Sequence, residues 1–396
     1  MTASRPTSGE APLPHAMNNF ALELVEIIAG FLDNESLRDL RLSCRSLQAK
    51  TFPHFARRFF SSIGTDLSDE SLRRIHAISQ SPDLGPYVQS LTFMLEKGVG
   101  HGLVWDRHPW GPLSAPMKVD AVRQFRDDLI YSLPNCRSFF IYCRFPEGHP
   151  GMTHVTMTDA VAVFFALVLD AQLPVMSFHL IYANRFSHPL IMDMRRLPKL
   201  LYRQPEFKVL WSNLQKLSLA QYLNLDNFGF LLELVLSAPN LQSLILNLGS
   251  HDLACEFMHE LAEMASFQHL RELVLSRMSV RAPDLQKILG DVRGSLTGLT
   301  LYQVSLSSDD KWNDLLRGLA DGFESLQSIS LYNLCTTIPT KEVVVFPDLE
   351  KVSALCERPG QRLHMFYQDK SDKQAALGFE YSGSRMNQVL SLLQTT

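Results

Sequence analysis

A short phrase of apolar and polar residues recurs along most of this chain. In its clearest copy, residues 239–246 (PNLQSLIL), Leu241 is followed by two polar residues and then by Leu244, Ile245 and Leu246. Nine copies begin at Val88, Cys136, Val175, Leu214, Leu241, Leu270, Leu296, Leu326 and Leu349. From Leu214 onward they recur every 23 to 30 residues, which is the spacing of an array of stacked supersecondary units.

Apolar residues at helical spacing follow several of these copies, for example Phe257, Leu261 and Met264. A unit of strand, loop, helix and loop cannot bury its own apolar side, so neighbouring units stack as a right-handed parallel array. We therefore expect an α/β fold in residues 87–356. Its parallel sheet should line the concave face of a horseshoe, with the helices on the convex face.

The residues between the repeated leucines are predicted to face a partner. Successive side chains of a strand point to opposite faces, so the leucines enter the core and their neighbours face outward. Aromatic side chains on such a face are typical of interfaces. The predicted target-binding residues are Phe140, Tyr142, His179, Ile245, Asn247, Tyr302 and Tyr332. The alternative is that helices, a loop or the C-terminal tail cover some of these positions.

The N-terminal part has a different pattern. Residues 1–17 are polar and proline-rich, lack an apolar stretch long enough for a secretory signal, and are predicted to be a disordered lead. Apolar residues at helical spacing then begin, including Leu24, Ile27 and Phe31, and three short helices are expected in residues 18–60. So small a unit leaves apolar surface available for a partner. Residues 61–86 are predicted to form a helical linker.

The helical segment resembles an F-box. The matching residues are 20–24 (FALEL), Ile27, 37–45 (LRDLRLSCR) and 52–58 (FPHFARR), the last resembling fungal members of the family. Ala21 stands where the family usually has proline, which weakens the helix start modestly. The resemblance implies docking on a Skp1-like adaptor and, through it, on a cullin. The implied adaptor-binding residues are Phe20, Leu22, Leu24, Ile27, Leu37, Leu40 and Leu42.

The repeats are similar to the leucine-rich repeats of F-box proteins, with one departure. The family usually places Asn or Cys three residues after the second leucine of each pair. Those positions here hold Tyr222, Gly249, Met278, Val304 and Leu334, so the repeats are of an irregular kind. Together the two resemblances imply the substrate-recognition subunit of an SCF-type ubiquitin ligase. The alternative is a leucine-rich-repeat interaction scaffold whose N-terminal helices only cap the stack.

The composition of the chain limits which classes of partner and which cellular compartment are expected. A net charge of −4 gives no general attraction to nucleic acid or to an anionic membrane. The longest apolar run, residues 160–169, is about half of the ~20 residues that a membrane-spanning helix needs, and it predicts a buried helix. The six cysteines are scattered without CxxC pairs and are expected to be reduced. A cytoplasmic or nuclear protein is therefore expected.

No motif for catalysis, a cofactor or a metal emerges from the sequence, and no enzymatic activity is expected. His101 and His108 lie in a glycine- and proline-rich loop, residues 98–112, without further ligands at metal-binding spacing. That loop is either functional or a lid over the first repeats. An enzyme with an unrecognised site is the remaining class.

Structural predictions can be made for two further segments. The basic stretch 195–203 (RRLPKLLYR) is either a solvated turn or a site for an acidic or phosphorylated partner. Residues 357–396 are predicted to form a C-terminal cap or tail, with a closing helix through Met386, Val389, Leu390 and Leu393.

Overall fold

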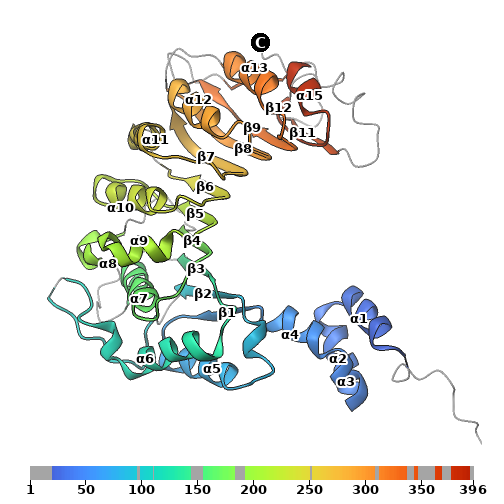
Figure 1. Cartoon of the computed structure of the whole chain (residues 1–396), viewed down its shortest axis with the longest axis vertical. Helices are drawn as coiled ribbons and strands as arrows, with labels where there is room; N and C mark the ends of the chain where they lie inside the picture. The colour runs from blue at the N-terminus through green and yellow to red at the C-terminus, as the bar shows by residue number, and fades with distance from the viewer. Residues whose placement is uncertain are drawn as a thin grey trace, which may run out of the picture.

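The computed structural model describes residues 20–95, 99–109, 111–143, 155–182, 192–249, 252–307, 312–336, 343–346, 362–367 and 376–392. Within them the chain is a mixed α/β protein. A twelve-stranded, mostly parallel sheet forms the body, and a small group of helices precedes it (Figure 1).

The N-terminal helical unit, residues 20–60, contains α1 (Leu22–Phe31), α2 (Asn34–Ser43), α3 (Arg45–Lys50) and α4 (Phe52–Phe60). Three helices were expected, and the fourth arises because the extended backbone at Cys44 separates α2 from α3. The Asp33 side chain caps α2 by accepting a hydrogen bond from the Ser36 amide. A few small and aliphatic side chains form the interior of the unit: Val25, Ala29, Leu37, Leu47 and Ala56.

Nine parallel strands follow in chain order. They are β1 (Ser62–Thr65), β2 (Ser90–Leu95), β3 (Ser138–Cys143), β4 (Ser177–Tyr182), β5 (Lys216–Ala220), β6 (Ser243–Asn247), β7 (Glu272–Val280), β8 (Gly298–Leu306) and β9 (Ser328–Tyr332). The short β10 (Cys335–Thr336) pairs with β8. The repeated phrases align in the sheet, since Leu217, Leu244 and Leu273 are register partners on adjacent strands.

The first eight phrases are thus confirmed as strands, and the apolar positions that define them are buried. The ninth, Leu349 with Val352 and Ala354, lies outside the described residues. Helices cover the face of the sheet onto which these leucines point (Figure 1). They are α5 (Asp69–Ser79), α6 (Asp120–Asp127), α7 (Met157–Asp170), α8 (Leu200–Arg203), α9 (Pro205–Trp211), α10 (Leu225–Leu236), α11 (Asp252–Met264), α12 (Ala282–Asp291) and α13 (Trp312–Gly322).

Helix α7 contains the long apolar run and is buried along almost its whole length, as expected. Phe164 and Phe165 pack among a group of rings that includes Phe178 and Trp211. The Trp211 indole N–H donates to the Leu234 carbonyl at 2.8 Å, so its polar atom is satisfied inside the core. None of the helices within the described residues is both long and apolar enough to cross a bilayer.

Both ends of the sheet contain strands that the pattern of residues did not predict. Segment 61–86 contains its expected helix as α5. It also contains β1, the first edge strand, in which Ile63 and Thr65 are buried in register with Leu91 and Phe93. At the other end, β12 (Ala376–Ser382) pairs antiparallel with β9, and β11 (Arg362–Tyr367) pairs antiparallel with β12. The expected closing helix is α15 (Met386–Leu392), which buries Met386, Val389 and Leu390.

Candidate interaction surfaces

The first candidate surface is an apolar stripe on α1. Val25 and Ala29 face the interior of the helical unit, so residues on the opposite side of the helix remain outside. Leu24, Ile27 and Phe31 lie at helical spacing on that side and are 52%, 58% and 86% exposed. This exposed set is named the α1 stripe. Its Phe31 was absent from the predicted site, although its position seven residues after Leu24 was the signal for it.

The other predicted adaptor-binding residues differ in how far their side chains are exposed to solvent. Leu22 and Leu42 are exposed, at 46% and 83%, whereas Phe20 and Leu40 are half-buried. Leu37 is fully buried inside the helical unit, so it supports the unit from within rather than lining its surface.

Arginine and aromatic side chains hold α2 against α4. The Arg41 guanidinium lies 4.0 Å from the ring centroid of Phe55, and that of Arg38 lies 4.7 Å from the centroid of Phe59. The ammonium group of Lys50 donates to the Phe20 carbonyl at 2.7 Å. These contacts fix the helices that carry the exposed leucines.

The second candidate surface is the face of the sheet opposite the helices, here named the open face. Phe140, Tyr142 and His179 lie on it in neighbouring strands, and all are half-buried. The rings of Phe140 and His179 stack with centroids 4.1 Å apart, and the His179 Nε2 lies 2.8 Å from the Ser177 Oγ. Burial, together with the nearby Lys216 charge, lowers the pKa of His179 to about 4, so the imidazole is neutral near pH 7.

The remaining predicted target-binding residues also lie on the open face. Ile245 and Asn247 are half-buried in the middle of the sheet. Tyr302 on β8 and Tyr332 on β9 are register partners whose rings stack with centroids 5.2 Å apart. The structure adds Phe366 on β11, whose ring meets the Tyr332 ring edge-on at 5.1 Å. Phe366 could not be predicted from the repeated phrase, because it lies outside the repeats in the antiparallel hairpin of β11 and β12.

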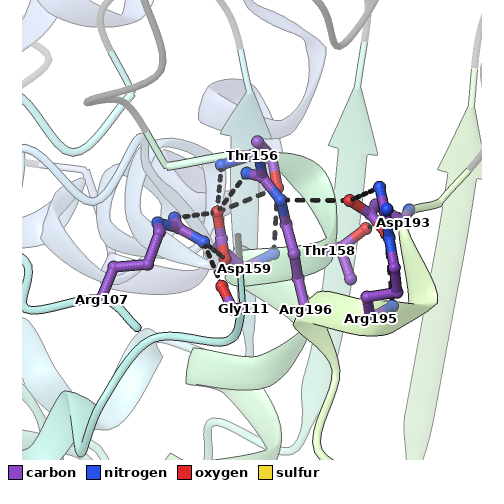
Figure 2. A network of polar contacts seen from close by, with 8 residues as sticks. All are labelled: Arg107, Gly111, Thr156, Thr158, Asp159, Asp193, Arg195 and Arg196. Carbon is purple, nitrogen blue, oxygen red and sulfur yellow. Dashed lines mark hydrogen bonds and ion pairs between the residues drawn. The ribbon is translucent and has the colours of Figure 1, made fainter. Parts of the chain in front are cut away.

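A buried polar network organises the loops that follow β2, β3 and β4 (Figure 2). The Arg107 guanidinium donates two hydrogen bonds to the Asp159 carboxylate, at 2.8 and 2.5 Å. Asp159 is fully buried near the start of α7, where its carboxylate also accepts from the Thr156 amide at 2.9 Å. Arg196 approaches the same carboxylate at 3.4 Å. One carboxylate therefore connects three chain segments that are distant in sequence.

The two arginines at the start of the basic stretch 195–203 differ in exposure. Arg196 is buried between Asp159 and Asp193, so the expectation of a solvated turn or an acidic partner is wrong for this residue. The Arg195 side chain is 80% exposed and pairs with Asp193 at 2.8 Å, which agrees with the solvated turn.

The described part of loop 98–112 packs onto the first units of the sheet. Val99 is buried, the Trp105 indole N–H donates to the Gly100 carbonyl, and the His101 carbonyl accepts from the Asp69 amide. These contacts favour the interpretation as a cover over the first repeats. Gly98 and Trp110 lie outside the described residues.

The described residues also line cavities, one on the helix side of the sheet and one that reaches the edge of the open face at Gly64 and Met94. One, of about 350 Å³, lies between α12 and α13, with Leu289, Leu315 and Phe323 in its wall. The other, of about 320 Å³, is polar and lies where β1 ends and α5 begins, beside Asp66 and Arg74. In the part of the chain that the structure describes, no three His, Cys, Asp or Glu side chains are grouped so that they could hold a metal ion.

Comparison with models of known protein families and with curated protein sequences gave no match to this chain.

Proposed function

We propose that this chain is the substrate-recognition subunit of an SCF-type ubiquitin ligase. Its N-terminal helical unit acts as an F-box that docks on a Skp1-like adaptor and thereby on a cullin. The following array acts as an irregular leucine-rich-repeat horseshoe, whose concave surface is the open face and binds the target protein. The role is non-catalytic, because holding a target close to the ubiquitin-transferring enzyme raises its effective concentration there. The cytoplasm or the nucleus is the compartment that fits this role.

The observation that carries the proposal is the α1 stripe. A unit of about 40 residues has a small interior, and leaving three large apolar side chains of one helix in water is unfavourable by about 25 cal/mol for each Å² of apolar surface. A partner that covers the stripe removes that cost. Leu24 and Ile27 of the stripe also match the F-box pattern of the sequence, so the surface and the motif point to the same partner.

The direct test is co-purification with Skp1. We expect the intact chain to form a stable complex, and replacement of Leu22, Leu24 and Ile27 by glutamate to abolish it, because three charges would have to be buried in the contact. The three side chains are 46%, 52% and 58% exposed, so the variant should keep its fold.

The matched control uses exposed apolar residues elsewhere. Leu200 and Val209 are 78% and 68% exposed on α8 and α9, so their replacement by glutamate should leave the complex intact. A complex that survives the α1 substitutions would refute the docking assignment. It would favour the scaffold in which the helices only cap the array.

A further inference from the structure

An aromatic group lies beside an unpaired carboxylate on the open face. It comprises Tyr302, Tyr332 and Phe366, named the aromatic cluster, together with Glu380 of β12. All four lie near the C-terminal end of the sheet, where β8, β9, β12 and β11 are adjacent (Figure 1).

A glycine allows the aromatic cluster to form. Tyr332 and Phe366 belong to strands two positions apart, which are separated by about 10 Å in a sheet. Their ring centroids are nevertheless 5.1 Å apart, because the residue between them in register is Gly378. A Cβ atom at Gly378 would lie 3.1 Å from the Tyr332 ring and 2.3 Å from the Leu331 carbonyl oxygen. Any larger residue would therefore separate the rings.

Glu380 lies on the same face, two residues along β12 from Gly378, at a distance of about 7 Å. Its side chain is exposed. Within the described residues its carboxylate forms no ion pair or hydrogen bond, unlike that of Glu272 on the same face, which accepts from the Ser243 hydroxyl. Glu380 is thus an available anion next to an apolar surface.

Neighbouring groups do not cancel this charge. His364 is the register partner of Glu380, and its ring packs edge-on against Phe366 at 4.7 Å. Arg362 shares the face and is the register partner of Ser382, two residues from Glu380 along β12, and in the described part of the chain no ion pair joins its guanidinium to the Glu380 carboxylate. Next to the rings the face therefore carries the Glu380 carboxylate, and Arg362 lies further along β11 from Phe366.

We propose that this surface binds an arginine or lysine side chain from an extended segment of the target protein. The aliphatic stem would lie on the Tyr332 and Phe366 rings, and the cationic head would meet Glu380. A long cationic side chain covers apolar surface with its stem while its head stays polar, and about 7 Å is close to its length. This inference depends on one part of the proposed function, namely that the open face binds the target protein.

The test measures binding of short labelled peptides to the full-length chain without adaptor. The probe alternates arginine with glycine, and the matched probe carries citrulline, which has nearly the shape of arginine but no charge. We expect the arginine peptide to bind at least about threefold more tightly. The replacement Glu380→Gln should remove that difference, because the charge of the head is then unmatched. Phe366→Ala should weaken the binding of both peptides, because both place the same stem on that ring, whereas Tyr302→Phe should retain the difference because the aromatic ring remains.

Control variants test whether the difference in peptide binding depends on the open face. Glu256 is an exposed carboxylate on α11, on the helix side of the sheet, and Tyr131 is an exposed tyrosine remote from the open face. Glu256→Gln and Tyr131→Ala should leave binding unchanged, and thermal melting should show that every variant is folded. Equal binding of the two peptides, no binding of either, or an equal loss in Glu256→Gln would overturn the proposal. Binding of the adaptor is measured separately, with variants of α1. Failure of the peptide test therefore leaves the docking proposal standing, and failure of the docking test leaves the peptide proposal standing.

Discussion

At the scale of single residues, Asp159 is the side chain on which most of the polar organisation depends. Its carboxylate has no contact with solvent and binds two arginines and the first turn of α7. A buried carboxylate is stable only when hydrogen bonds and opposite charges replace its hydration. Arg107, Arg196 and Thr156 supply that replacement here, and the loop after β2 is anchored as a result.

Removing this carboxylate should be strongly destabilising. In Asp159→Ala, Arg107 and Arg196 lose a buried counterion, and the free energy of unfolding should fall by about 3 to 5 kcal/mol. Chemical denaturation measures the change. The control is Asp120→Ala, since Asp120 is 88% exposed in its pair with Arg123 and should contribute no more than about 1 kcal/mol. Equal losses in the two variants would mean that the network does not hold the loop.

His179 makes the stability depend on pH. Its pKa is lowered to about 4 in the folded chain, mainly by burial, from an ordinary value of 6.5. Between these values the unfolded chain binds more protons than the folded chain, so the free energy of unfolding decreases as the pH falls from about 6.5 to about 4. The imidazole is partly open to solvent, which reduces the effect to about 1 kcal/mol at about pH 5.

The pH effect is measured by comparing the intact chain with His179→Gln. Urea denaturation at about pH 7 and about pH 5 should show that the intact chain loses about 1 kcal/mol more than the variant. Identical losses would contradict the depressed pKa.

At the scale of elements, each strand of the parallel sheet separates packing from recognition. In β6, Leu244 and Leu246 are buried under the helices, while Ile245 and Asn247 lie half-buried on the open face. In β7 and β8, Arg277 and Gln303 take φ values of 50° and 53°, in the left-handed region. This conformation costs about 1 kcal/mol for residues other than glycine. It allows both strands to continue pairing beyond it, as Met278 pairs with Val304.

Adjacent residues of β6 test this division. Leu244→Ala should lower the free energy of unfolding by about 2 to 5 kcal/mol, because it leaves a cavity in the core. Ile245→Ala, one residue away on the other face, should cost no more than about 1.5 kcal/mol. Thermal or chemical denaturation of both variants gives the comparison. A larger loss for Ile245 would reverse the assignment of the two faces.

At the scale of the whole molecule, the helical unit and the sheet have separate interiors joined by a short connection. Helix α4 leads directly into β1, and the Phe52 ring meets Tyr87 edge-on with centroids 6.1 Å apart. Figure 1 shows α1–α3 beyond α4, away from the strands. The α1 stripe and the aromatic cluster lie at opposite ends of the chain. Two partners can therefore be proposed for two surfaces, and each can be disrupted alone.

Much of this architecture was accessible from the pattern of residues. The first eight phrases predicted eight strands and their buried faces, since alternation along a strand and the period of a helix are local properties. The seven predicted target-binding residues all lie on the open face for the same reason. The helix at Met386, Val389 and Leu390 was found through its spacing.

Other features were decided only by tertiary structure. Nothing near Asp159 in the sequence identifies Arg107 and Arg196 as its partners, because each lies more than 35 residues away and is brought in by the stacking of units. Strand β1 is too short for its alternation to be recognised, and it is a strand because β2 offers a pairing edge. Likewise, Phe366 joins the repeated tyrosines only through the hairpin and Gly378. The sequence by itself therefore determined which residues face the core, since that follows from local periodicity. Which distant residues meet was decided by the packing of the whole chain.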